Sequence, residues 1–379
     1  MKITKLPIFI LIFSFGFLFT NISIPIGVSM THFDNIHGSC SIFTAAIGDT
    51  VLFGNNEDYL LDGTYMWFFP SQKLETSNGI MQTYGAVFFG FDNNDHPADG
   101  YVQGGMNDKG LCWDGNGLPV LPMIPHPERE DTHQYFHFFM EILWECSTVN
   151  ETIEWYESHY LGDAIACQMH FADATGDAVV ISRGLDGELA FTRISNSTHL
   201  ISTNFNLADY SNGWYPCTRY SAVDFYLESL SSEEDLTVSY CEHILDVVST
   251  SQTSYSNIFD LPRRDIYVYY ESSFNRVEKL NLDEELENLT TGMNGEPTTL
   301  GYNTWILGNL TSNAIRIGDL FPSQYPWFPE TPDPENVSLN PWLLIPFIFG
   351  IGSLTVGAVT ASIFGSKRLI RYFKKHRIE

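Results

Sequence analysis

The sequence predicts an α+β protein in which antiparallel sheets are layered with helices. Three observations lead to this prediction: strand-like segments follow one another in runs, helical segments come in pairs, and the sequence shows no internal repeat. A chain of 379 residues with 44% hydrophobic residues can bury a large core, and this composition excludes disordered, collagen-like and coiled-coil chains.

Strands are predicted where short apolar runs are bounded by Gly, Asp or Asn. In chain order they are residues 41–46, 51–55, 87–91, 112–113, 170–172, 178–182, 188–194, 200–203, 255–259 and 266–270. The first two strands flank the turn Gly48-Asp49, and the pairs 170–172 with 178–182 and 255–259 with 266–270 also have the pattern of hairpins.

Helices are predicted where apolar residues recur at helical spacing. They are residues 133–146, 149–159, 219–230 and 235–248. Ser147 or Asn150 is a candidate cap for the second helix.

The charge is unevenly distributed along the chain. Residues 40–341 hold 44 of the 46 acidic residues but 11 of the 19 Lys and Arg, whereas six basic residues lie in the last thirteen positions. The net charge of −27 argues against nucleic acid as a partner.

Both ends of the chain have the pattern of membrane signals. Lys2 and Lys5 precede the apolar residues 7–20, which predicts a signal peptide over 1–28 and a short pro-segment over 29–39. Residues 342–364 contain no charge and are long enough to span a ~30 Å hydrocarbon core. The basic tail, residues 365–379, then predicts a cytoplasmic C-terminus.

The body between these signals is therefore expected outside the cytosol, as the extracellular or lumenal part of a single-pass membrane protein. It divides into a folded domain over 40–320 and an acidic, Pro-rich stalk over 321–341. Candidate N-glycosylation sites are Asn150, Asn196, Asn288, Asn309 and Asn336. Six cysteines in an oxidising compartment invite pairing, and the plausible local bridges are Cys146 with Cys167 or Cys217 with Cys241.

The segment CSIFTAAIGDTVLFGNNEDY, residues 40–59, is the most informative stretch. A Cys opens a strand, and the returning strand should bring Asn55 and Asp58 back beside Cys40. A thiol needs a base to become a nucleophile, and no His lies near Cys40 in this segment. If the mature chain begins at Cys40, its own α-amine, with a pKa of about 8, can serve as that base.

This segment resembles the N-terminal-nucleophile (Ntn) hydrolases of the choloylglycine hydrolase and penicillin V acylase type, which are related to the acid ceramidase and isopenicillin N acyltransferase groups. Segments similar to the family's further motifs follow in the expected order: 105–111 (GMNDKGL), 142–155, 169–181, 202–204 (STN), 218–220 (TRY) and 253–282. Together they cover roughly residues 40–290.

The resemblance implies an αββα sandwich and hydrolysis of a linear, non-peptide amide through a thioester on Cys40. It implies that Asp58 holds the α-amine, that Asn204 supports the oxyanion and that Arg219 orients the site. It implies no cofactor and no metal.

Two positions depart from the family pattern. Asn55 stands where the family turn usually carries Arg, and Asn116 lies one residue away from the family's second oxyanion Asn. The candidate substrate-binding or oxyanion residues are therefore Asn55 and Asn116.

Several alternatives stay open. Cys40 could be half of a disulfide, and Asn55 and Asp58 could be plain turn residues. His133, His137 and Glu141 share one helix face and could offer a metal two imidazoles and a carboxylate, although a semi-buried helix face explains them more simply.

The expected partner is a small-molecule or lipid amide, and a homo-oligomer stays open. Trp67, Phe69, Trp113 and Trp214 are candidates for an apolar acyl pocket. The alternative functions are an acyltransferase that uses the same thioester and an inactive, glycosylated cell-surface binding module.

Overall fold

The computed structural model describes residues 40–59, 63–76, 79–92, 100–131, 138–291, 300–301, 309–310 and 312–321. All of them belong to one unit, which ends at Phe321. The predicted signal peptide, pro-segment, transmembrane helix and basic tail, and the predicted stalk after Phe321, lie outside the described residues. Within the described ranges, none of the helices is both long and apolar enough to cross a membrane.

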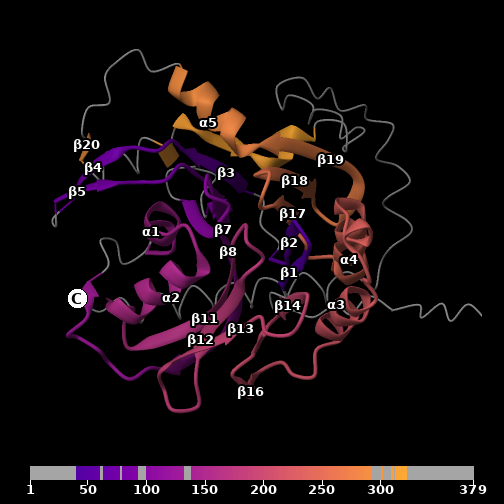
Figure 1. Ribbon diagram of the computed structural model, residues 1–379, viewed down its shortest axis with the longest axis horizontal. Helices are drawn as coiled ribbons and strands as arrows, with labels where there is room; N and C mark the ends of the chain where they lie inside the picture. The colour runs from indigo at the N-terminus through magenta and orange to yellow at the C-terminus, as the bar shows by residue number, and fades with distance from the viewer. Residues whose placement is uncertain are drawn as a thin grey trace, which may run out of the picture. The chain divides into compact units, whose positions relative to one another are not determined.

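Two antiparallel sheets form the centre of this unit (Figure 1). The six-stranded sheet contains, in spatial order, β14 (His199–Ser202), β1 (Ser41–Ile47), β2 (Thr50–Glu57), β17 (Tyr255–Asp260), β18 (Asp265–Tyr270) and β19 (Ser273–Asn281). The eight-stranded sheet contains β13 (Leu189–Arg193), β12 (Ala178–Arg183), β11 (Ala164–Ala172), β8 (Cys112–Pro122), β7 (Gly100–Asn107), β6 (Ala86–Asp92), β3 (Thr64–Phe69) and β21 (Ala314–Arg316).

Smaller elements surround these sheets. Short strands pair as β9 (Glu130–Asp131) with β10 (His159–Tyr160), as β15 (Phe205–Asn206) with β16 (Asp209–Gly213), and as β20 (Leu300–Gly301), β4 (Lys73–Thr76) and β5 (Gly79–Gln82). The helices are α1 (Phe138–Glu145), α2 (Val149–Ser158), α3 (Thr218–Glu228), α4 (Val238–Val248) and α5 (Leu282–Thr291), with 3₁₀ turns at Glu233–Asp235 and Ile317–Leu320.

Helices cover the outer face of each sheet. Trp144 of α1 and Tyr156 of α2 pack in one apolar cluster with Trp67 of the eight-stranded sheet. Val223 of α3 and Leu245 of α4 pack in another cluster, against the six-stranded sheet. Figure 1 shows α1 and α2 on one side of the strands and α3 and α4 on the other.

A third apolar cluster fills the space between the sheets. It joins Ile42 and Phe53 of the six-stranded sheet to Phe89 and Met106 of the eight-stranded sheet. The order helix, sheet, sheet, helix confirms the predicted α+β class and the αββα layering. It arises because each sheet is apolar on both faces and needs a cover on each.

The β1–β2 hairpin is longer than the sequence predicts. Gly48 in its turn has φ +62°, a conformation that glycine adopts without strain. β2 continues to Glu57 because β1 pairs with it on one side and β17 on the other. Asn55 and Glu57 are therefore strand residues rather than part of a loop beyond the strand.

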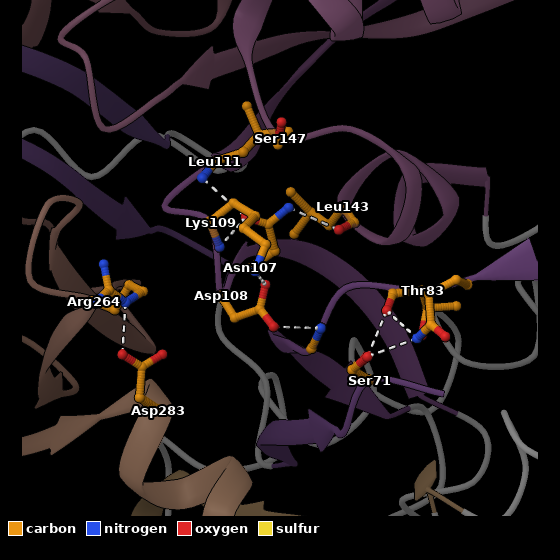
Figure 2. A network of polar contacts seen from close by, with 12 residues as sticks. Ser71, Thr83, Asn107, Asp108, Lys109, Leu111, Leu143, Ser147, Arg264 and Asp283 are labelled. Atoms are coloured by element: carbon orange, nitrogen blue, oxygen red, sulfur yellow. Dashed lines mark hydrogen bonds and ion pairs between the residues drawn. The ribbon is translucent and has the colours of Figure 1, made fainter. Parts of the chain in front are cut away.

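The GMNDKGL turn is connected to the end of α1 by hydrogen bonds of Asn107, as Figure 2 shows. Asn107 Nδ2 donates to the carbonyls of Leu143 and Cys146 at 2.8 Å each, and its Oδ1 accepts from the backbone N–H groups of Lys109 and Leu111. This turn therefore holds the end of α1.

Other sequence predictions need correction. The first predicted helix corresponds to α1, which ends at Glu145, one residue before the predicted end; the predicted part before Phe138 lies outside the described residues. The cap of α2 is Thr148, whose side chain accepts from Glu151 N, rather than Ser147 or Asn150. Strands β3 and β7 were not predicted, and β8 is eleven residues long instead of two.

All six cysteines are unpaired, so neither predicted bridge forms. Cys217 caps the start of α3, and Cys241 lies in the first turn of α4. Tyr226 near the end of α3 contacts Tyr240 at the start of α4, so the helices are antiparallel and the two cysteines lie towards opposite ends of the pair.

Candidate active site

Cys40, Glu57 and Tyr255 form a row across the six-stranded sheet. Ser41 pairs with Asn56, which sets Cys40 beside Glu57, and Glu57 pairs with Tyr255 on the other side. Successive side chains of a strand point to opposite faces. Because Phe53 and Tyr255 belong to the cluster between the sheets, Glu57 also faces that space.

The carbonyl of Cys40 is held by two of the predicted residues. Arg219 Nη1 donates to Cys40 O at 2.7 Å, and Asn116 Nδ2 donates to the same oxygen at 3.3 Å. Arg219 also donates to Ser41 Oγ at 2.8 Å and to Asn204 Oδ1 at 3.1 Å, and Asn204 Nδ2 donates to Gly117 O at 3.1 Å. Four predicted residues, Cys40, Asn116, Asn204 and Arg219, are thus joined in one network.

Asp58 lies beside the sulfur of Cys40. Its backbone N–H faces the sulfur, and its carboxylate oxygen Oδ1 accepts from Thr253 Oγ1 at 2.5 Å. Asn55 occupies the next row of the sheet, where its Nδ2 donates to Asn257 Oδ1 at 3.4 Å. Asp58 is therefore next to Cys40 as predicted, whereas Asn55 contacts Asn257.

The surroundings of Cys40 are buried and acidic. Burial raises the pKa of the Cys40 thiol well above its usual range, and the neighbouring Glu57 and Asp58 raise this pKa further. Burial also raises the pKa of Glu57 to about 8 and raises the pKa of Asp114 on β8. These surroundings oppose ionisation of the Cys40 thiol, so Cys40 needs a proton acceptor before it can react.

Glu57, Asp114 and Tyr255 were not predicted as site residues. For Glu57 the sequence contains a partial indication. Glu57 follows Asn55 by two positions, so in a strand both side chains lie on the same face. Asp114 fits because Gly104 on the neighbouring strand has no side chain: a Cβ there would meet Asp114 Oδ2 at 2.3 Å. No local pattern relates Tyr255 to Cys40, because their proximity depends on strand pairing.

Several buried polar atoms near this row have no hydrogen-bond partner among the described residues. They are Asn55 Oδ1, Glu57 Oε2, Asn116 Oδ1, Tyr255 OH and Asn257 Nδ2. Unpaired buried polar atoms are uncommon and cost free energy, so their concentration here is typical of a functional site.

His170 is a buried histidine with structural contacts. Its ring nitrogens lie 2.9 Å from Thr44 Oγ1 and 3.0 Å from Ser202 Oγ, and burial lowers its pKa to about 3. Asp173 accepts from the backbone N–H groups of Val149 and Thr175, so it orients a turn.

The alternative metal site gains no support. His133 and His137 lie outside the described residues, and Glu141 is fully buried in α1. Among the residues that the structure describes, no group of three or more His, Cys, Asp or Glu side chains is arranged to hold a metal ion.

The predicted aromatic pocket is largely core. Trp67, Phe69 and Trp113 are buried against α1 and α2, whereas Trp214 is 48% exposed. A cavity of about 200 Å³ lies on this helix-facing side of the eight-stranded sheet, lined by residues that include Phe139, Cys167 and Met169. It does not include Cys40.

The glycosylation candidates differ in exposure. Asn150, Asn196 and Asn288 are exposed, and Asn336 lies outside the described residues. Asn309 is only 7% exposed, and its Oδ1 accepts from Asn313 Nδ2 at 2.6 Å. This burial leaves little room for a glycan at Asn309.

The chain resembles solved structures, but no known sequence family matches it. Solved structures with a similar chain path include two variants of conjugated bile acid hydrolase from Clostridium perfringens. Each is 16% identical to this chain, and the TM-scores are 0.49 and 0.48. Each match covers 65% of this chain and 93% of the bile acid hydrolase chain. Penicillin V acylase from Agrobacterium tumefaciens is 17% identical, with a TM-score of 0.48, over 65% of this chain and 87% of the other. These names match the hydrolase type that the sequence motifs resemble. No family model matches, and no curated protein matches.

Proposed function

We propose that this protein is an amidase that hydrolyses linear, non-peptide amides through Cys40, after the chain has been cut to make Cys40 its first residue. The observation that carries the proposal is the network around Cys40. A cysteine used only for packing does not need Arg219 and Asn116 on its carbonyl and Asp58 beside its sulfur.

The mechanism follows from these contacts. The α-amine of Cys40 takes the thiol proton, the sulfur attacks the amide carbonyl, and the same amine returns the proton to the leaving nitrogen. Asp58 holds the ammonium form of this amine, and Arg219 and Asn116 fix the main chain of Cys40.

Asn204 is the proposed oxyanion donor. An amide side chain has two N–H donors. One N–H of Asn204 bonds to Gly117, which leaves the second for the oxyanion, an effect worth about 3–4 kcal/mol. Water then hydrolyses the thioester.

Exposed aromatic side chains beside Asn204 favour a substrate with an apolar acyl group. Trp214 N donates to Asn204 O, and Tyr210, Trp214 and Tyr215 are each about half exposed. Apolar rings on the surface next to a reactive centre suit an acyl chain. A lipid amide is therefore the favoured substrate class. If an amine replaces water in the last step, the same thioester makes the protein an acyltransferase.

A linear amide of this class is expected to acylate Cys40. The test incubates the mature protein briefly with bile-salt, penicillin V, N-acylethanolamine and ceramide amides, quenches in acid, and locates the added acyl mass by peptide mass spectrometry. We expect a thioester on the peptide that begins at Cys40, and the long-chain lipid amides should label it most. An acyl mass on another residue, or hydrolysis with no label on Cys40 under single-turnover conditions, would contradict the proposal.

We also propose that residues 40–341 lie outside the cytosol and residues 367–379 inside it. The proposal is supported by the uncharged residues 342–364 and the basic residues after them. Protease added to intact cells should remove the body and spare a C-terminal tag. A body that survives in intact cells but is digested after permeabilisation would refute this topology.

A further inference from the structure

The uncut chain poses a problem that the mature chain does not. Before the cut, the nitrogen of Cys40 belongs to the peptide bond with Ser39, and an amide nitrogen is not a base. The amine that is proposed to activate the thiol in turnover therefore does not yet exist. The pKa of the Cys40 thiol is raised, so some other group must accept its proton if the chain cuts itself.

We propose that Glu57 is the base for this first cut, between Ser39 and Cys40, and that the α-amine released by the cut takes over in later turnover. The inference rests on the proposed function, because it concerns how the nucleophile of that site is made. It adds a catalytic residue that acts once in the life of each chain.

The structure places the Glu57 carboxyl group within hydrogen-bond distance of the Cys40 sulfur. Cys40 Sγ donates to Glu57 Oε1 at 3.5 Å, and the carboxyl group is buried, with 3% of the residue exposed. The other oxygen, Oε2, has no partner among the described residues. Because β2 is paired on both sides, the backbone that carries Glu57 is held in register with Cys40.

The other acids near the sulfur have different partners. Asp58 Oδ1 accepts from Thr253, and the part of Asp58 that faces the sulfur is its N–H. Asp114 Oδ1 accepts from Gly115 N at 2.7 Å. Asp58 raises the pKa of both Glu57 and Cys40, and Asp114 raises the pKa of Cys40. The pKa of the buried Tyr255 phenol is raised by its burial and by Glu57 and Asp114. Burial together with Asp58 gives Glu57 a pKa of about 8, which suits a base that works near neutral pH.

The chemistry balances without any group that the chain lacks. The ionised carboxylate of Glu57 takes the thiol proton, and the thiolate attacks the carbonyl carbon of Ser39. The bond from that carbon to the nitrogen of Cys40 breaks, the protonated Glu57 gives its proton to this nitrogen, and a thioester links Ser39 to the sulfur. Water hydrolyses the thioester, which releases the carboxylate of Ser39 and restores the thiol.

The experiment separates the cut from turnover in the full-length chain. Residues 36–39 are Ile-His-Gly-Ser, so the two substitutions His37→Glu and Ser39→Arg create Ile-Glu-Gly-Arg, after which factor Xa cuts. Glu57→Gln is made in the natural chain and in this cleavable chain. Glu141→Gln, which removes another buried carboxyl group, is the matched control. The N-terminal residue and amide hydrolysis are measured before and after factor Xa.

Glu57→Gln should keep residues 29–39 attached and slow the cut at least about 100-fold, the range of a lost general base. Glu141→Gln should be cut like the parent. Factor Xa should convert the cleavable Glu57→Gln chain into a protein that begins at Cys40 and hydrolyses the amide. A Glu57→Gln chain that matures at the parental rate would overturn the proposal.

Two further outcomes are decisive. If factor Xa activates the cleavable parent but not its Glu57→Gln form, Glu57→Asp decides, because it keeps a carboxylate. Equal rates of cutting in Glu57→Asp and Glu57→Gln would overturn a role as base, and faster cutting in Glu57→Asp would support it. If the cleavable parent, correctly cut at Cys40, hydrolyses no amide, the proposed function fails, while the rate of the cut still tests Glu57.

Discussion

Cys40→Ala is expected to lower amide hydrolysis at least about 10³-fold and to leave residues 29–39 attached to the chain. The variant removes the atom that attacks both the substrate and the Ser39 carbonyl. Cys40→Ser should also lose most activity, because an alcohol with a much higher pKa demands a stronger base than the α-amine. N-terminal sequencing and steady-state kinetics measure the two effects.

Cys167→Ala is the matched control, since Cys167 is an unpaired cysteine on β11 that lies in neither the Cys40 network nor its acidic surroundings. It should mature and hydrolyse normally. Iodoacetamide should inactivate the parent, whereas EDTA should not. A metal held by His133, His137 and Glu141 would give the reverse result. Activity that survives Cys40→Ala but is lost to chelation would rule out the proposed mechanism.

Arg219→Lys is expected to lower kcat/KM about 100-fold, which corresponds to about 2.7 kcal/mol of transition-state stabilisation. The guanidinium donates at once to the Cys40 carbonyl, to Ser41 Oγ and to Asn204 Oδ1. A lysine ammonium keeps the charge but cannot reach these acceptors in the same planar geometry. The nucleophile and the proposed oxyanion donor would then lose their common anchor.

Arg193→Lys offers a control of the same chemistry, because Arg193 pairs with Asp177 in a partly exposed ion pair away from Cys40. That variant should stay within about threefold of the parent, as expected for a surface pair. Thermal unfolding of both variants separates loss of activity from loss of fold. An Arg219→Lys protein as active as Arg193→Lys would show that Arg219 is not part of the catalytic machinery.

Much of the fold could be predicted because its signals are local. The hairpin that opens with Cys40 follows from two apolar runs around Gly48-Asp49, and the helix pairs follow from apolar spacing. The predictions were poorer for β3, β7 and β8. These strands lie inside a sheet with both faces covered, so their sequences lack the alternation of apolar and polar residues by which strands are recognised.

The site was predicted in part. Cys40, Asn204 and Arg219 each lie in a segment that resembles a family motif, whereas Asn116 lies one residue away from the family position. The structure joins all four through hydrogen bonds. For the aromatic candidates the sequence left core and pocket both open, because a buried Trp67 or Trp113 has the same local pattern as one that lines a pocket.

The sequence by itself determined the residue types of the candidate site, their order along the chain and the hairpin that returns Asp58 to Cys40. Only the tertiary structure decided that Glu57 touches the thiol, that Tyr255 pairs with Glu57 in the same row, and that Arg219 links Cys40 to Asn204. It also decided that Asp114, from the other sheet, lies close enough to raise the pKa of Cys40. Strand pairing brings Tyr255 beside Glu57 across about half of the length of the chain, and burial raises the pKa of Glu57. Neither the register of distant strands nor the depth of burial is encoded in any short segment of sequence.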